Sequence, residues 1–209
     1  ASRGLGDVYK RQVVLSLIAR SRKKTLEERV AEAANAIKGA FAILIMSNDK
    51  LIAFRDPYGF RPLCLGRLDH GWVVASETCA LDLVGAHYVR DIKPGEMIVI
   101  DDADKEPTSL MYAQHQPEHR AHCIFEFVYF ARPDSIMDGE SIYLARVNMG
   151  RILARETKDI KADIVISVPD SGTPAAIGYG LEKGIPFLEG LTKNKYIGRT
   201  FIQPTQKQR

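Results

Sequence analysis

One segment of this chain combines a predicted strand, a polar loop and the start of a predicted helix. It reads Ile164-Val165-Ile166-Ser167-Val168-Pro169-Asp170-Ser171-Gly172-Thr173-Pro174-Ala175-Ala176-Ile177-Gly178. The first residues are apolar and mostly β-branched, which is typical of a buried parallel strand, whereas the Ala-rich residues that follow favour a helix. The loop between them therefore lies where open α/β sheets bind ligands, and where free backbone N–H groups and the helix dipole favour a phosphate group.

The same loop carries oxygen atoms that suit a hard cation. Asp170, Ser171 and Thr173 offer carboxylate and hydroxyl oxygens beside the predicted phosphate site. From the residues alone, the favoured role of Ser171 is the N-cap of the helix, a position in which serine is common. Farther on, residues 185–187 have the pattern of a second strand parallel to the first, after a crossover helix that ends at Gly184.

The composition is that of an ordinary globular protein. The chain has 209 residues, of which 45% are hydrophobic and 26% charged, so one or two domains are expected. A net charge of +3 is too small to argue for nucleic acid or a membrane surface as a partner. No apolar run is long enough to cross a bilayer, and residues 1–12 lack the apolar core of a signal peptide. Three widely spaced cysteines form neither a disulfide framework nor a zinc pattern, which favours reduced thiols in the cytoplasm.

Periodicity predicts two helices followed by a mainly antiparallel β region. The apolar run at 13–18 is typical of the end of a helix, and Thr25-Leu26-Glu27-Glu28 is a capping box that opens a second helix through Ile37. Between Ala40 and Asp101, short apolar runs alternate with turns, which indicates strands. These runs lie at 41–46, 51–54, 63–67, 72–76, 89–92 and 97–100, with a short helix at 77–84.

Two further elements and one ion pair are expected from the residues. A candidate edge strand lies at 109–112, and an amphipathic helix is expected over 141–156. Five apolar side chains of that helix are expected to face inward: Ile142, Ala145, Met149, Ile152 and Leu153. Arg55 and Asp56 are expected to link strands through a salt bridge.

Several short motifs follow one another in a characteristic order. They are Arg55-Asp56-Pro57-Tyr58-Gly59-Phe60-Arg61-Pro62-Leu63, Ala75-Ser76-Glu77-Thr78, Lys93-Pro94-Gly95-Glu96, Phe127-Val128-Tyr129-Phe130-Ala131-Arg132-Pro133-Asp134-Ser135, Val168-Pro169-Asp170-Ser171 and Lys193-Asn194-Lys195-Tyr196-Ile197-Gly198-Arg199-Thr200-Phe201. From about Val13 to the last residue, the chain closely resembles the glutamine phosphoribosylpyrophosphate amidotransferase (amidophosphoribosyltransferase) family. Its members catalyse the first committed step of purine synthesis.

The resemblance implies an α+β domain of the N-terminal-nucleophile hydrolase type, followed by an α/β domain of the type I phosphoribosyltransferase class, both partial. The implied divisions are 1–12 for a foreign or misread leader, 13–102 for the C-terminal part of a class II glutamine amidotransferase domain, 103–122 for a connection and 123–209 for the N-terminal part of the phosphoribosyltransferase domain. In the family, ammonia released from glutamine travels through a closed channel. It then displaces pyrophosphate from phosphoribosyl pyrophosphate, with Mg²⁺ bound.

Both ends of the chain depart from the family pattern. Family members open with a cysteine nucleophile, whereas this chain begins with Ala1, and no internal cysteine has that context. The family's strand that ends in two aspartates and a hydroxyl-rich loop has no match either, since Asp101-Asp102 is interpreted as a turn. We therefore expect an internal fragment without a catalytic nucleophile, which by itself has neither glutaminase nor transferase activity.

The resemblance also implies binding residues. Ser171 matches the family's Mg²⁺ contact, and Asp170 could orient a metal-bound water or only terminate the strand. The backbone of this loop is often strained in the family, and a non-proline cis peptide is one form that the strain could take. A flexible loop whose cations would neutralise the diphosphate matches four more residues: Lys193, Lys195, Tyr196 and Arg199. From charge alone, these four residues would be a solvated basic segment.

Cys123 matches one ligand of the [4Fe–4S] cluster that some family members hold. Such a cluster needs four thiolates, so the alternative is a buried apolar cysteine, as we expect for Cys64 and Cys79. The resemblance further implies glutamine and phosphoribosyl pyrophosphate as substrates, purine nucleotides as inhibitors, a homo-oligomer and a cytoplasmic location.

Two other functions compete with this interpretation. A non-catalytic regulator that binds phosphoribosyl pyrophosphate would not need the glutaminase-type β region at 40–101. Another class II glutamine amidotransferase, such as a hexosamine-forming enzyme, would place a sugar isomerase domain after the connection. The strand, loop and helix around Asp170 and Ser171, together with the basic loop, argue against that enzyme.

Overall fold

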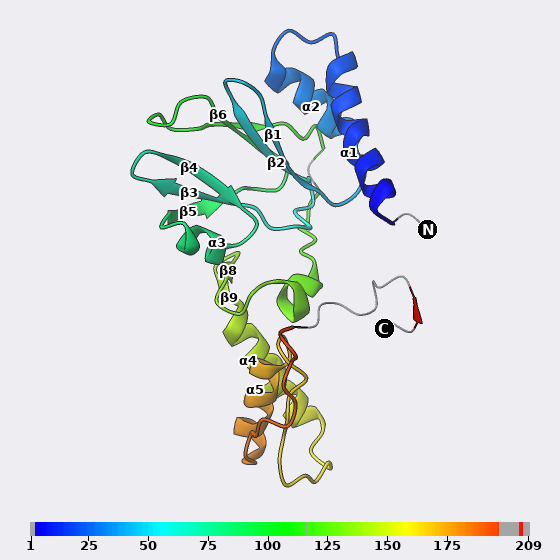
Figure 1. Ribbon diagram of the computed structural model, residues 1–209, viewed down its shortest axis with the longest axis vertical. Coiled ribbons are helices and arrows are strands. Elements are labelled where there is room, and N and C mark those ends of the chain that lie inside the picture. The colour runs from blue at the N-terminus through cyan, green and yellow to red at the C-terminus, as the bar shows by residue number, and fades with distance from the viewer. Residues whose placement is uncertain (1–2, 116, 197–204, 207–209) are drawn as a thin grey trace. The chain divides into compact units, whose positions relative to one another are not determined.

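The computed structural model describes residues 3–115, 117–196 and 205–206 (Figure 1). They divide into two compact units. Unit 1 contains the chain up to Glu126 together with Asp134–Glu140, and unit 2 contains Phe127–Pro133 and the chain from Ser141 onward. The domain boundaries inferred from the sequence, with a connection at 103–122, stay a prediction. None of the helices in the described residues has the length and apolar content needed to cross a membrane.

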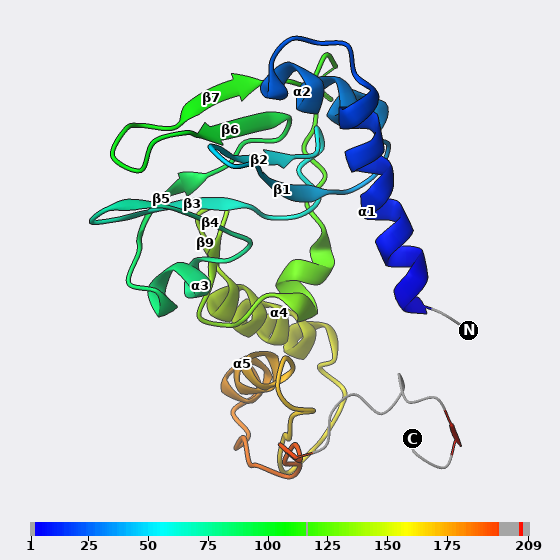
Figure 2. The same cartoon turned by 45° about the horizontal axis from the view of Figure 1, so that its top comes forward.

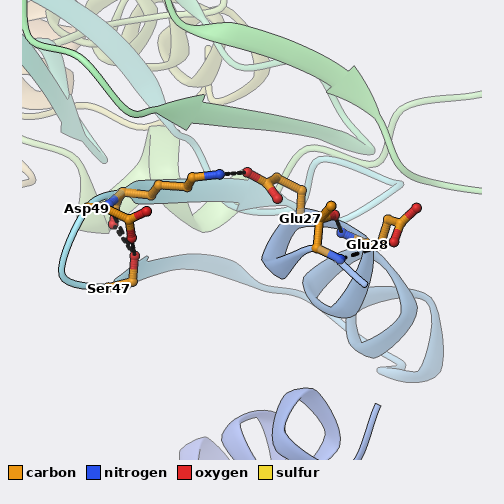
Figure 3. A network of polar contacts seen from close by, with 6 residues as sticks. Glu27, Glu28, Ser47 and Asp49 are labelled. Atoms are coloured by element: carbon orange, nitrogen blue, oxygen red, sulfur yellow. Dashed lines mark hydrogen bonds and ion pairs between the residues drawn. The ribbon is translucent and has the colours of Figure 1, made fainter. Parts of the chain in front are cut away.

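Two helices open unit 1, as predicted. They are α1 (Arg3–Arg20), which begins well before the apolar run at its end, and α2 (Leu26–Ala36). The capping box is confirmed, because the Glu28 N–H donates to Thr25 Oγ1 and the Thr25 N–H donates to Glu28 Oε2, both at 3.2 Å. Beside it, Lys50 Nζ lies 2.5 Å from Glu27 Oε1, an ion pair that ties α2 to the turn after the first strand (Figure 3).

A four-stranded antiparallel sheet packs against these helices (Figure 2). Its order is β1-β2-β6-β7, formed by β1 (Ala42–Met46), β2 (Leu51–Arg55), β6 (Glu96–Ile100) and β7 (Thr108–Met111). Phe54 and Met97 are fully buried and belong to one apolar cluster with Val30 and Ala34 of α2. The predicted pairing of the first two strands and the predicted edge strand are therefore confirmed.

A second antiparallel sheet has the order β4-β3-β5. It is formed by β3 (Cys64–Leu68), β4 (Gly71–Ala75) and β5 (His87–Asp91), with the short helix α3 (Thr78–Leu83) beside it. β5 and β6 flank one tight turn but belong to different sheets. The chain changes sheet there because the Ile92 N–H donates to Leu63 O (2.8 Å), whereas the Gly95 N–H donates to the carbonyl oxygens of Arg55 and Asp56 (3.2 and 3.1 Å).

Unit 2 is built around two closely packed helices. These are α4 (Ile142–Glu156) and α5 (Thr173–Lys183). Most of a π-helical turn, η1 (Glu126–Phe130), also belongs to unit 2, whereas the paired strands β8 (Ile136–Met137) and β9 (Glu140–Ser141) belong to unit 1 apart from Ser141. A Cβ atom on Gly150 would lie 1.9 Å from the Ala175 carbonyl oxygen, and one on Gly178 would lie 2.0 Å from that of Val147. The backbones of α4 and α5 are therefore in contact.

The inward face of α4 differs from the predicted one. Ile142 is buried as expected, but Ile152 and Leu153 are 52% and 51% exposed. The remaining buried residues of this helix are Arg146, Val147, Gly150 and Ala154. Hydrophobic periodicity misses this face because glycine adds no apolar side chain, yet it lets two helices approach most closely.

The apolar run at 164–168 was expected to be a buried parallel strand, and that prediction is only half right. Val165 forms a parallel bridge with Phe187, in which the Val165 N–H donates to Pro186 O (3.0 Å). Ile164 and Val168, however, are 48% and 73% exposed. A parallel strand is buried when other strands flank it and helices cover both sheet faces. Within the described residues, this run pairs with the segment around Phe187 alone.

Candidate functional site

A cavity of about 860 Å³ in unit 2 contains most of the predicted binding residues. Four of them line it together: Asp170, Ser171, Lys193 and Lys195. Tyr196 follows directly and is fully exposed (100%), outside the lining. Arg199 lies outside the described residues. The cavity thus joins the strand-to-helix loop to the basic loop, which lies about twenty residues farther along the chain.

The loop geometry separates two interpretations of Ser171. α5 begins at Thr173 with Gly172 as its N-cap residue, so the alternative interpretation of Ser171 as the N-cap is wrong. Thr173, which was expected to offer a cation ligand, is not part of the lining, because its hydroxyl lies 3.0 Å from the Ser167 hydroxyl and ties the helix to the preceding run. The Pro169–Asp170 peptide bond is cis, as the family resemblance implies.

Charges of both signs meet in this cavity. Lys193 Nζ lies 3.0 Å from Asp170 Oδ2, and both side chains are mostly exposed. Lys195 adds a second cation, and Glu189 adds a second carboxylate. An exposed ion pair of this kind contributes about 0–1 kcal/mol, so Lys193 can exchange Asp170 for a bound anion at little cost. The nearby N-terminus of α5 favours the same sign of ligand.

An aromatic pair forms the apolar part of the cavity. Tyr129 and Phe130 both line it, and their ring centroids lie 5.5 Å apart. Sequence reasoning used these residues as part of a family motif but assigned them no place in a site. The signal for them was the dense aromatic run at 125–130, which is too long and too apolar for an ordinary surface turn.

The cysteines behave mainly as core residues. Cys64 and Cys79 are buried, as predicted, and burial raises the pKa of both thiols, to about 12 for Cys64. Cys123 is partly buried, and its N–H donates to Phe60 O (3.2 Å). The described residues hold no group of three or more His, Cys, Asp or Glu side chains that could bind a metal ion. Cys123 could supply one of the four thiolates that a [4Fe–4S] cluster needs, and that role stays a prediction.

Arg55 and Asp56 are structural residues of unit 1, but the predicted salt bridge between them is not formed. Each makes hydrogen bonds to backbone groups. Arg55 is 2% exposed and donates to carbonyl oxygens, those of Gly59, Arg61 and Ile92, at 2.7–2.9 Å. Asp56 is fully buried and accepts hydrogen bonds from the N–H groups of Phe41, Tyr58 and Phe60. Burial lowers the pKa of Arg55. Each side chain therefore organises the backbone of the turn, in place of pairing with the other.

Comparison with known proteins finds close relatives that share one name. A model of the glutamine amidotransferase domain matches residues 11–83. Amidophosphoribosyltransferase from Mycobacterium bovis is 54% identical over 182 residues, which cover 87% of this chain and 33% of that protein. The enzyme of the same name from Archaeoglobus fulgidus is 49% identical over 174 residues, which cover 83% of this chain and 37% of that protein. Over most of its own length, the chain thus matches one segment of the amidophosphoribosyltransferases.

A solved structure of this family agrees with the fold. Glutamine phosphoribosylpyrophosphate amidotransferase from B. subtilis, complexed with ADP and GMP, matches with a TM-score of 0.85 and 45% identity, over 94% of this chain and 42% of that one. The match is consistent with a glutamine amidotransferase domain of the N-terminal-nucleophile type. The chain spans about a third to two-fifths of the length of these relatives. Their names agree with the first functional interpretation, and not with a non-catalytic regulator or a hexosamine-forming enzyme.

Proposed function

We propose that this chain is part of an amidophosphoribosyltransferase, which converts glutamine, phosphoribosyl pyrophosphate and water to phosphoribosylamine, glutamate and pyrophosphate in the first step of purine synthesis. One observation carries the proposal. Asp170 and Ser171 share a cavity with Lys193 and Lys195, at the N-terminus of α5. Unit 2 would then belong to a type I phosphoribosyltransferase domain, and its cavity would bind the diphosphate of the substrate.

The basic residues of the cavity would bind the diphosphate and stabilise its departure. Lys193 and Lys195 would neutralise diphosphate oxygens, and Tyr196 and Arg199 would act from the same loop. When ammonia attacks C1 of the ribose, the C1–oxygen bond breaks and pyrophosphate leaves with the electron pair. The lysines would stabilise the negative charge that develops on the departing oxygen, and loop closure would exclude water.

Mg²⁺ is the metal that fits this chemistry. Ser171 provides a hydroxyl and Asp170 a carboxylate in one cavity, and both oxygens are hard ligands. Magnesium usually keeps waters and takes further ligands from substrate phosphates, so Ser171 could supply a direct ligand while Asp170 orients a bound water. The bound ion would add positive charge against the leaving pyrophosphate.

Unit 1 would belong to the glutaminase half that supplies ammonia. Cys64 and Cys79 are buried with raised thiol pKa values, so neither fits a reactive nucleophile. The B. subtilis relative is described in complex with ADP and GMP, which supports purine nucleotides as inhibitors here. A homo-oligomer in the cytoplasm completes the proposal, and free thiols are compatible with that compartment.

Calorimetric titration of the purified chain with phosphoribosyl pyrophosphate and Mg²⁺ tests the site. The parent chain should bind, and Ser171→Ala and Lys193→Gln should each weaken binding about fivefold to tenfold, through loss of a metal ligand and of a charged hydrogen-bond donor. Lys161→Gln, an exposed lysine outside the cavity, is the matched control and should bind as the parent does. A parent chain without measurable affinity would contradict the proposal.

Activity is tested by exchange of segments. The Mycobacterium bovis relative is 54% identical over 87% of this chain, so this chain can replace the matching segment of that enzyme. The chimera should form phosphoribosylamine from glutamine, and the Ser171→Ala chimera should lose most of that activity while it still hydrolyses glutamine. A chimera that folds and hydrolyses glutamine but makes no phosphoribosylamine would count against the transferase role.

A further inference from the structure

α4 carries a buried arginine that neither the family motifs nor the proposed chemistry uses. Arg146 is 2% exposed. Its Nε donates to Phe127 O at 2.6 Å, and its Nη2 donates to Ala131 O at 2.8 Å. Both acceptors belong to unit 2, as Arg146 does. One planar guanidinium therefore joins two carbonyl oxygens that lie four residues apart in the chain.

A buried guanidinium is energetically less favourable than an apolar side chain at the same position. Removing such a charge from water is unfavourable, hydrogen bonds recover only part of that loss, and an apolar side chain of similar volume avoids it. The hydrogen bonds that Arg146 donates to Phe127 O and Ala131 O therefore do something that packing alone does not. They hold the ends of one short backbone segment at a set distance and orientation.

That segment carries the aromatic wall of the cavity. Between the two acceptor carbonyls lie Val128, Tyr129 and Phe130, and the latter two line the cavity with Asp170 and Ser171. The segment also contains most of the π-helical turn, whose backbone hydrogen bonds are less regular than those of an α-helix. α4 makes a second contact nearby, since the Tyr143 N–H donates to Pro133 O (3.1 Å).

We propose that Arg146 is a positioning residue: it fixes Tyr129 and Phe130 as the apolar wall against the ribose of phosphoribosyl pyrophosphate. This inference rests on the proposed function. The charged side chains of the cavity suit the diphosphate, whereas the aromatic wall suits the less polar ribosyl part and excludes water from its reactive carbon. Arg146 thus acts on the ribose end of the ligand and leaves the diphosphate end unaffected.

This division predicts a difference between two ligands. Arg146→Met removes the guanidinium donors with little change in volume. It should weaken binding of phosphoribosyl pyrophosphate with Mg²⁺ about tenfold and leave binding of inorganic pyrophosphate with Mg²⁺ unchanged within about twofold. Arg146→Lys, which keeps a charged donor, should restore part of the loss. Arg151→Lys on the exposed side of the same helix is the control and should change neither affinity.

A double-mutant cycle and a ligand-free measurement complete the test. Phe130→Leu should produce the same selective loss, and Phe130→Leu with Arg146→Met should lose little more than either alone, because both act through one wall. Without ligand, backbone amides of residues 128–131 should exchange hydrogen about tenfold faster in Arg146→Met than in the parent chain.

The outcomes separate the inference from the proposed function. A parent chain that binds neither ligand overturns both. A parent chain that binds both, with an Arg146→Met variant that loses the two affinities equally or loses neither, overturns the positioning role alone. Unchanged amide exchange at 128–131 also overturns it, whether or not any ligand binds.

Discussion

At the scale of the residue, Glu96 is a buried carboxylate of unit 1 whose two oxygens both accept hydrogen bonds. It is 1% exposed and accepts hydrogen bonds from Arg90 (2.7 and 2.9 Å), Ser109 (2.5 Å) and the Lys93 N–H (2.6 Å). Burial alone would raise the pKa of Glu96, but these donors outweigh burial and hold it below its usual value. Glu96→Gln should therefore lower the free energy of unfolding by about 2 kcal/mol at neutral pH, as measured by urea denaturation.

The pH dependence of this loss has a definite sign. Because the folded pKa lies below the unfolded value of about 4.3, the contribution of Glu96 is complete above that pH and disappears as the pH falls through the folded pKa. The parent and Glu96→Gln should thus converge in stability as the pH falls below about 4. Glu106→Gln, which changes an exposed glutamate, should stay near the parent throughout. A difference between parent and Glu96→Gln that persists undiminished in acid would refute the assignment.

At the scale of the element, the contact between α4 and α5 depends on two glycines. A Cβ atom on Gly150 or Gly178 would lie about 2 Å from a carbonyl oxygen of the facing helix. The two helices would have to move apart to accommodate it. Gly150→Ala should therefore destabilise unit 2 by about 3 kcal/mol or more, seen as loss of helical circular dichroism at lower urea. Asn148→Ala on the exposed side of α4 should shift the transition little. Equal effects of the two substitutions would show that the helices do not touch as described.

At the scale of the whole molecule, the apolar core is unevenly divided. The three clusters of buried apolar side chains found among the described residues all lie in unit 1. Unit 2 should consequently unfold first, so urea denaturation should show two transitions. Trp72, the single tryptophan, lies in β4 of unit 1, so its fluorescence should report the later transition alone. Gly178→Ala should move the earlier transition in circular dichroism and leave the fluorescence transition in place. A single coincident transition by both probes would contradict this division.

Local structure could be predicted wherever neighbouring residues decide it. The capping box at Thr25 and Glu28, the antiparallel strands of the β region and the helix end at Gly184 all follow from contacts within a few residues. Four predicted binding residues also line one cavity. They could be predicted because the strand-to-helix loop and the basic loop match motifs of a known family. Hydrophobic periodicity, in contrast, was right for Ile142 of α4 but wrong for Ile152 and Leu153, which are exposed.

The features that only the tertiary structure revealed depend on contacts between residues that are distant in sequence. Residue patterns did not predict that Ile164 and Val168 are exposed or that β5 and β6 belong to different sheets. They also did not predict the carbonyl partners of Arg55. The role of Arg146 was also unforeseen: from α4 it donates hydrogen bonds to the backbone segment that carries Tyr129 and Phe130. Residue type and spacing encode the preference of a segment for helix, strand or turn. Which carbonyl, backbone or partner strand a side chain meets is settled only when separate segments pack, since close packing and buried hydrogen bonds admit few arrangements.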